Sequence, residues 1–236
     1  MFTRGLGAPD DLAVRNAAVF FSDEHTGAIG QVRGGKLRVI ARHLRAPEGL
    51  IVREKSIVVV EQGRNRLLEI SRRTHRRRVV LNFSNPYGRL GVDGIHPAPG
   101  GGIYIPDSPN GRLLLFISGR TKLLASGLGR PVDAISYRGG IAIADETADA
   151  VWFLRRGHLR RLATVSTPDD LAVVGASLLA TALGDGSLWE IKPRVRRLAT
   201  GYRDPQGLAV LGKHTVLVAD STLNEMYRVN LAACSL

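Results

Sequence analysis

The sequence predicts an all-β protein: a six-bladed β-propeller with four antiparallel strands per blade. A similar segment recurs six times along the chain, beginning at Pro9, Pro47, Val92, Pro131, Pro168 and Pro205. The steps between these starts are 38, 45, 39, 37 and 37 residues, and a repeat of about 40 residues built from short strands is typical of propeller blades. Each copy also contains four short apolar stretches separated by turn residues, which is the pattern of consecutive antiparallel strands.

The fourth copy shows the expected strands most clearly, at residues 133–137, 141–144, 151–154 and 159–164. Short turns rich in Arg and Gly join the first pair and the last pair. A polar corner follows the second strand in every copy, as in Asp145-Glu146-Thr147. We expect the Asp and Asn side chains of these corners to bond nearby amides, which is their usual role in turns.

The two ends of the chain are expected to meet in the sixth blade. Residues 2–7 resemble the segments at 124–129 and 198–203, each of which leads from the last strand of one copy into the next. The sixth copy ends with its third strand, at 225–230, and has no fourth. The N-terminal segment is therefore predicted to supply the outer strand of blade six, so that the ring closes and sheet edges are hidden.

Composition agrees with one globular domain over residues 1–236. The chain is 44% hydrophobic with a mean hydropathy near zero, which suits a large buried core. No apolar run approaches the roughly 20 residues of a membrane helix, so we expect no membrane partner. Met1 leads directly into the expected closing strand, and Cys234 is the only cysteine. Without a signal peptide or an intrachain disulfide, a cytoplasmic location is the expectation.

The chain is strongly basic, with 33 Lys and Arg against 21 Asp and Glu and a net charge of +12. Of the basic residues, 18 lie in or beside the hairpins between third and fourth strands, where charge discourages pairing with other sheets. The densest group could hold an anion and comprises Arg72, Arg73, Arg76, Arg77 and Arg78. It lacks the interleaved aromatic residues on which single-stranded nucleic acid stacks, so a solvated edge is favoured over nucleic-acid binding.

A row of acidic residues occupies the second position of the repeats. The row reads Asp10, Glu48, Asp93, Val132, Asp169 and Gln206. Because first strands line the channel of a propeller, these side chains should converge at its mouth. Four carboxylates there would repel one another unless a cation or raised pKa values relieved them. Ordinary turn chemistry is the better explanation of any single Pro-Asp pair, whereas for the row as a set both interpretations stay open.

Other candidates lie near the same face. The long second step contains an extra stretch at 84–91 that carries Tyr87 and Arg89, and it is interpreted either as a lid or as a surface insertion without function. These two residues, His25 in a polar corner and Gln206 are the candidate substrate-binding residues. His96 stands in a row that is otherwise apolar and is read either as a hydrogen-bonded core residue or as a catalytic residue.

The repeats resemble NHL-type propellers, most closely at residues 218–221 and more loosely at 143–146. They are also similar to the senescence-marker/gluconolactonase family and its strictosidine-synthase-like relatives. That resemblance implies a divalent metal in the channel, held by Glu, Asn and Asp, with the Asp also acting as base. By blade order Asp10 matches the Glu and Asp169 the Asp. The Asn positions fall at Val92 and Val132, so a site would have to recruit Glu48 or Asp93.

The resulting hypothesis is a small-molecule hydrolase, lactonase- or esterase-like, acting at the channel mouth. Ca²⁺, Mg²⁺ or Mn²⁺ would be bound by Asp10, Glu48, Asp93 and Asp169 in some combination, because such hard ions prefer oxygen ligands. Asp169 and His96 are the candidate catalytic residues. Two alternatives stay open because propellers host many functions: a non-catalytic scaffold for protein partners, and an anion or nucleic-acid binder through the Arg72–Arg78 face.

Overall fold

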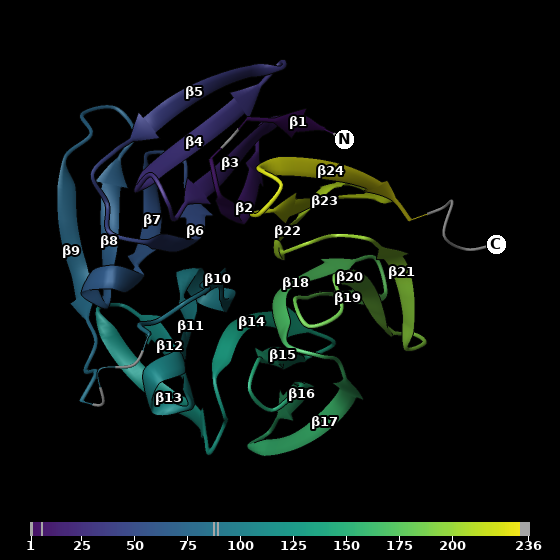
Figure 1. Cartoon of the computed structure of the whole chain (residues 1–236). Helices are drawn as coiled ribbons and strands as arrows, with labels where there is room; N and C mark the ends of the chain where they lie inside the picture. Colours follow the sequence, from purple (N-terminus) through teal and green to yellow (C-terminus); the bar gives the residue numbers. More distant parts are fainter. Residues whose placement is uncertain (1, 6, 87, 89, 232–236) are drawn as a thin grey trace.

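The structure is a computed structural model that describes residues 2–5, 7–86, 88 and 90–231. Six four-stranded antiparallel sheets surround a central channel (Figure 1). The first strand of each blade lies nearest the channel, as Figure 1 shows for β2, β6, β14, β18 and β22. The predicted fold class is confirmed. No helix among the described residues is long and apolar enough to cross a bilayer.

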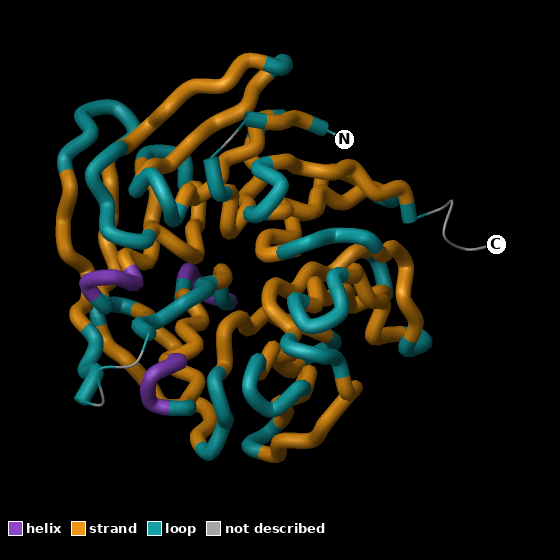
Figure 2. The backbone as a smooth tube through the Cα atoms, in the orientation of Figure 1, coloured by secondary structure: helices purple, strands orange, loops and turns teal. Residues whose placement is uncertain are grey.

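The first three blades run from residue 9 to residue 126. Blade one contains β2 Pro9–Arg15, β3 Ala18–Asp23, β4 Ala28–Arg33 and β5 Lys36–Ala41. Blade two contains β6 Pro47–Val52, β7 Ser56–Glu61, β8 Arg66–Ser71 and β9 Arg77–Asn82. Blade three contains β10 His96–Pro97, β11 Ile103–Asp107, β12 Arg112–Ile117 and β13 Arg120–Ser126. The short 3₁₀ turns in these blades, purple in Figure 2, are η1 Gln62–Arg64, η2 Pro99–Gly101 and η3 Ser108–Asn110.

The remaining blades complete the ring. Blade four contains β14 Pro131–Tyr137, β15 Gly140–Asp145, β16 Ala150–Arg155 and β17 His158–Thr164. Blade five contains β18 Pro168–Val174, β19 Ser177–Ala182, β20 Ser187–Lys192 and β21 Arg196–Thr200. Blade six contains β22 Pro205–Gly212, β23 Thr215–Asp220, β24 Glu225–Asn230 and, from the other end of the chain, β1 Thr3–Arg4.

The predicted ring closure is confirmed, with a shorter strand than expected. In β1, Thr3 pairs with Met226 and Arg4 with Glu225. The Phe2 N–H extends the contact by donating to the Met226 carbonyl at 2.6 Å. The strand ends at once because Gly5 has φ +71°, which lies outside the extended region.

The first strand of blade three also differs from the repeat, because β10 begins at His96 although the repeat begins at Val92. The segment before it is held by bonds to neighbouring blades. The Val92 N–H donates to Asn65 Oδ1 at 3.0 Å, and the Gly94 N–H donates to the Val132 carbonyl at 2.8 Å. These bonds fix the backbone around Asp93 at the channel.

The apolar core lies between adjacent blades. Both faces of most blades are covered by neighbours, so second strands such as β3 and β19 are buried almost throughout. Their sequences are accordingly continuous rather than alternating apolar runs. One such interface packs Phe20 and Ile29 of blade one against Leu50 and Ile57 of blade two. Rigid packing of this kind fixes the position of every first strand around the channel.

The corner carboxylates have the turn role expected of them. Asp145 is fully buried and accepts bonds from the amides of Gly129 at 2.9 Å and Arg130 at 2.8 Å. Asp220 does the same for Arg203 at 2.8 Å and Asp204 at 3.3 Å. Each corner therefore holds the loop that enters a first strand, and the Asp145 corner places Arg130 beside the channel.

Candidate functional site

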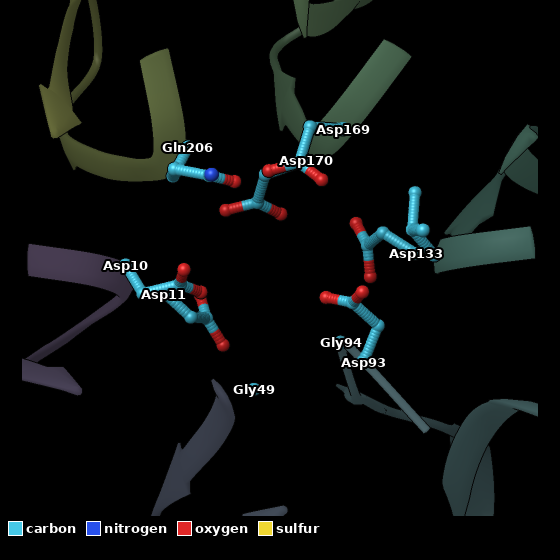
Figure 3. Close-up of a pocket in the computed structure, with 10 residues that line it drawn as sticks. Asp10, Asp11, Gly49, Asp93, Gly94, Asp133, Asp169, Asp170 and Gln206 are labelled. Atoms are coloured by element: carbon cyan, nitrogen blue, oxygen red, sulfur yellow. The ribbon is translucent and has the colours of Figure 1, made fainter. Parts of the chain in front are cut away.

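Acidic side chains gather at the end of the channel where the first strands begin (Figure 3). They surround a cavity of about 20 Å³, which is room for a single water or ion. The lining residues are Asp10, Asp11, Gly49, Asp93, Gly94, Val132, Asp133, Asp169, Asp170 and Gln206. Asp10, Asp93 and Asp169 of the predicted acidic row therefore converge here, and Val132 interrupts the row as expected. Glu48 does not line this cavity but lies within 4.8 Å of Asp10.

The acidic residues form two sets with different surroundings. The inner set is Asp11, Asp133 and Asp170, and each of these carboxylates accepts a backbone N–H from the next blade. The bonds are Leu50 N to Asp11 at 2.6 Å, Leu171 N to Asp133 at 2.9 Å and Leu208 N to Asp170 at 2.6 Å. These carboxylates hold neighbouring first strands together, and some of their oxygen lone pairs are already occupied by backbone amides.

Glycine occupies the same repeat position in the other three blades. A Cβ on Gly49 would overlap the Ile95 amide, and one on Gly94 or Gly207 would overlap a carbonyl oxygen of the neighbouring blade. First strands thus approach in two ways. They make backbone contact where the position is Gly, and they are bridged by a carboxylate where it is Asp.

The outer set is Asp10, Glu48 and Asp169, with Asp93 beside them. Burial raises the pKa of Asp10 to about 8, although a hydrogen bond to Glu48 opposes this. Burial, followed by the charges of Asp10 and Asp93, raises the pKa of Glu48 well above its usual range. The pKa of Asp169 is raised well above its ordinary value by burial and by the charges of Asp93 and Asp10. Crowded carboxyls of this kind are costly to ionise without a cation.

Counterions are unevenly distributed over this outer set. The Arg130 guanidinium donates to Asp93 at 2.5 Å and also pairs with Glu146. Burial still raises the pKa of Asp93, because the Arg130 charge offsets only part of that effect. In the part of the chain that the structure describes, no ion pair involves Asp10, Glu48 or Asp169. These three carboxyls therefore remain available to an added cation.

Oxygen atoms of Asp10, Glu24 and Glu48 lie within 4.8 Å of one another. Asp10 and Glu48 are buried, whereas Glu24 is exposed in the corner after β3. This geometry suits an ion bound by several carboxylates, and all of the donor atoms are oxygens, as Ca²⁺, Mg²⁺ and Mn²⁺ prefer.

His96 lies on a different cavity from Asp169. Its Nδ1 is 2.9 Å from Asp133 Oδ1, and its side chain is 24% exposed. The attraction of Asp133 and Asp11 raises the pKa of His96 even though burial, the largest single influence, opposes this. The structure therefore separates the two candidate catalytic residues, and a catalytic role for either one stays a prediction.

The other predicted residues fall in several places. Gln206 lines the acidic cavity, and His25 is exposed in its corner. Tyr87 and Arg89 lie outside the described residues.

The basic group lies at the end of blade two remote from the acidic cavity. Arg72 donates to the carbonyls of Arg53 and Glu54, in the turn that follows β6, whereas Glu48 stands at the start of that strand. Arg77 bonds the carbonyls of Arg42 and His43, and Arg78 pairs with Glu69 at 2.6 Å. Three of the five predicted anion-binding residues, Arg72, Arg77 and Arg78, therefore already bond to other groups within the protein. The remaining two are Arg73 and Arg76.

Sequence reasoning missed five residues of the site. They are Asp11, Glu24, Arg130, Asp133 and Asp170. A usable signal existed for three of them, because the repeat position after the acidic row reads Asp, Gly, Gly, Asp, Asp and Gly. Arg130 directly precedes the Pro that opens a repeat, which places it on the same face.

Comparisons with known proteins place the chain by its fold. No protein-family profile matches it, and no curated protein is detectably similar in sequence. Among solved structures it is similar to a protein assigned as a gluconolactonase, with a TM-score of 0.79 and 15% identity over 97% of this chain and 90% of that one. A calcium-binding regucalcin from Agrobacterium tumefaciens strain C58 has a TM-score of 0.75 and 12% identity over 92% and 83% of the two chains.

A chain of the nidogen/laminin complex is similar to the same degree, with a TM-score of 0.76 and 16% identity over 92% of this chain and 90% of that one. The resemblance to six-bladed propellers of the gluconolactonase and NHL types is thus confirmed as a likeness of fold. Identities this low leave the function to be argued from the site.

Proposed function

We propose that the protein is a divalent-cation-dependent hydrolase that cleaves a small ester or lactone at the acidic mouth of the channel. The observation that carries this proposal is the gathering of carboxyls around Asp10, which lies within 4.8 Å of Glu48 and lines the same cavity as Asp169. None of these three carboxyls forms an ion pair in the part of the chain that the structure describes. Neighbouring buried carboxyls repel one another when ionised, so such a group is rare unless protonation or a bound cation relieves the repulsion.

The donor chemistry fits a hard cation, which Asp10, Glu48 and Asp169 would hold. Asp10 and Glu48 have oxygen atoms within 4.8 Å of each other and of Glu24. Asp10 and Asp169 line the cavity of about 20 Å³, which has the volume of a single ion. A bound divalent cation would polarise a carbonyl oxygen and lower the pKa of a water molecule. The likeness to a calcium-binding regucalcin and to a protein assigned as a gluconolactonase supports this assignment.

The surrounding residues have separate roles in this proposal. Asp169 is the candidate general base as well as a ligand, since it lines the cavity and one carboxyl oxygen can bind the cation while the other accepts a proton. Gln206 can donate a hydrogen bond to a substrate oxygen, and Arg130 holds Asp93 in place. The cavity is too small for an ester or lactone, so the substrate would sit above it, at the open mouth.

The test compares the wild type with Glu48→Gln, Asp169→Asn and the control Glu54→Gln, whose carboxylate is exposed on the far face. We expect Ca²⁺ or Mn²⁺ to raise the melting temperature of the wild type and the control, and the two site variants to lose most of that shift. Hydrolysis of a δ-lactone and of 4-nitrophenyl acetate should follow the same order. A metal-dependent shift without hydrolysis would leave a cation site in a non-catalytic propeller.

The scaffold alternative has one observation in its favour. Val132 places an apolar side chain in the acidic ring, and the chain resembles one member of a protein–protein complex. No metal-dependent shift and no hydrolysis together would make a protein-binding propeller the preferred function. Anion binding through the basic group has less support, because Arg72, Arg77 and Arg78 already bond within the protein.

A further inference from the structure

A second cavity occupies the channel beyond the acidic residues, toward the far ends of the first strands. Its volume is about 300 Å³, at the lower end of the roughly 300–1,000 Å³ that small-molecule sites occupy. Most of its lining is apolar and includes Leu12, Val14, Leu50, Val52, Ile135 and Val173. Several of these side chains are only half-buried, and Val210 is 38% exposed, so solvent reaches an apolar wall.

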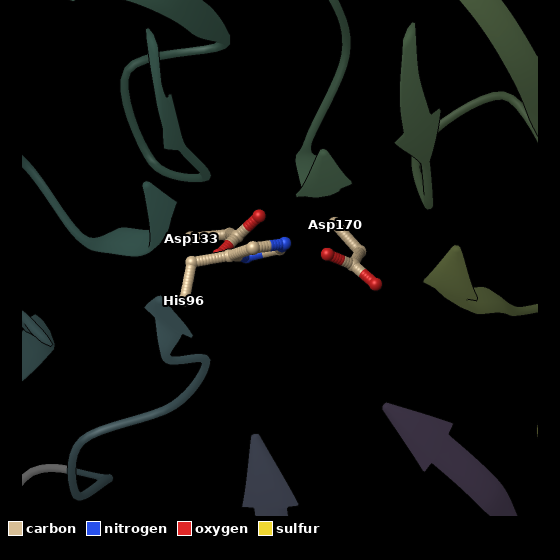
Figure 4. Close-up of side chains that lie close together, drawn as sticks. All are labelled: His96, Asp133 and Asp170. Carbon is tan, nitrogen blue, oxygen red and sulfur yellow. The ribbon is translucent and has the colours of Figure 1, made fainter. Parts of the chain in front are cut away.

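His96 and Asp11 are the polar side chains in that lining. Asp133 holds His96 through Nδ1 at 2.9 Å and is itself fixed by the Leu171 amide. Figure 4 shows the imidazole ring between Asp133 and Asp170. No hydrogen bond joins His96 Nε2 to any residue that the structure describes. Atoms of His96, Asp133 and Asp170 lie within 4.8 Å of one another, and an oriented polar group beside apolar walls is of the kind that fixes a ligand.

The charges around the cavity select for an uncharged ligand. A charged group entering it would lose its hydration against apolar walls. It would also meet both signs of charge, because the Asp11 carboxyl disfavours a carboxylate and His96, whose positive form Asp133 favours, disfavours an ammonium group. A hydroxyl group avoids both conflicts, since its oxygen can accept from Nε2–H while its proton goes to a carboxyl oxygen. It also suits the neutral imidazole, because it can donate to Nε2.

We propose that this cavity is a binding site for a small, mainly apolar alcohol or phenol, whose hydroxyl group bonds His96 Nε2 and whose hydrocarbon part contacts the Leu, Val and Ile walls. Asp10, Glu48 and Asp169 do not line this cavity, and among the described residues it shares only Asp11 with the acidic mouth. It therefore does not depend on a cation or on hydrolysis.

The experiment measures binding of four matched probes to the full chain by calorimetry: 4-methylphenol, toluene, 4-methylbenzoate and 4-methylbenzylamine. We expect 4-methylphenol to bind about tenfold more tightly than toluene, which is the effect of one hydrogen bond to a charged group. Both charged probes should bind more weakly than 4-methylphenol. Ca²⁺ and the Asp169→Asn change should leave these affinities unaltered.

Two variants locate the site. Val173→Phe fills the cavity and should abolish binding of 4-methylphenol and toluene, whereas Val195→Phe, at a position 48% exposed outside the channel, should change neither. His96→Phe keeps a ring but removes both nitrogens, so 4-methylphenol should fall to the affinity of toluene.

Three results would overturn the proposal: equal affinities for 4-methylphenol and toluene in the wild type, tighter binding of either charged probe, or binding that survives Val173→Phe. If the variants do not fold, the wild type still decides the matter. Titration with 4-methylphenol must move the His96 imidazole resonances in an NMR spectrum, and resonances that stay in place would refute the site.

Discussion

The carboxylate of Asp170 should contribute measurably to the free energy of unfolding, because it clamps blade five to blade six. Asp170 is 8% exposed and accepts the Leu171 amide at 2.8 Å and the Leu208 amide at 2.6 Å. Asp170→Ala removes both acceptors. The Leu171 amide keeps a bond to Asp133, so the main loss falls on the buried Leu208 amide.

The expected magnitude follows from that count. Depriving one buried N–H of its acceptor costs about 1–3 kcal/mol, and 2 kcal/mol corresponds to roughly 4–8 °C of melting temperature in a chain of this size. Asp170→Asn should cost less than half as much. Burial, together with Asp11 and Asp133, raises the pKa of Asp170 well above its usual range, so an amide resembles the neutral form of the carboxyl that this environment favours.

Urea denaturation followed by tryptophan fluorescence measures these differences. Glu54→Ala, at an exposed position in the turn after β6, serves as the control and should stay within about 0.5 kcal/mol of the wild type. An Asp170→Ala protein that unfolds at the wild-type midpoint would refute the clamp. A loss in Asp170→Asn as large as that in Asp170→Ala would refute the neutral state of the carboxyl.

Three further predictions concern stability. With EDTA present, the free energy of unfolding should fall as pH rises from about 4 to about 8, because folded Asp10, whose pKa is about 8, keeps a proton that the unfolded chain releases at 3.8. The slope for this site is at most about 1.4 kcal/mol per pH unit, and Ca²⁺ should reduce it. Urea midpoints that rise with pH would contradict this prediction. Deleting residues 1–8 should expose the edge of β24 and lower the melting temperature or cause aggregation, which differential scanning fluorimetry and light scattering detect; unchanged melting would contradict the closure. Gly207→Ala should cost about 1–3 kcal/mol, because its Cβ overlaps the Asp10 carbonyl, whereas Gly212→Ala, with open space around its Cβ, is the control; equal urea midpoints would show that blade six does not approach blade one so closely.

The repeats made the architecture predictable from the sequence. Blade number, ring closure and the convergence of the acidic row all follow from residues that recur at fixed repeat positions, such as Asp10 and Asp169. The extent of individual strands was less predictable. The bonds that hold Val92 and Gly94 run to other blades, and nothing within one repeat encodes them.

The division between the two acidic sets could not be predicted for a similar reason. Whether a carboxylate is free or clamped depends on the distance to an amide of the next blade, as between Asp11 and Leu50. The cavity beside His96 could have been predicted from the small residues at the same repeat position as His96. Its row contains Ala13, Ala172 and Ala209, all of which line the cavity, and three small side chains in one layer leave the channel unfilled.

The paired carboxyls in blades one and five separate two tasks that often conflict in metal-binding proteins. In Asp10-Asp11 and Asp169-Asp170, the second residue takes the amide donors and holds the ring together. The pKa is raised in both residues of each pair, but among the described residues no amide of the next blade donates to the first one. Its ionised form is therefore unfavourable in the folded chain alone and favourable beside a cation. Substitution of the first residue should therefore cost cation affinity and relieve strain, whereas substitution of the second should cost stability. In the proposed function, a bound cation would offset the electrostatic cost of the first residue.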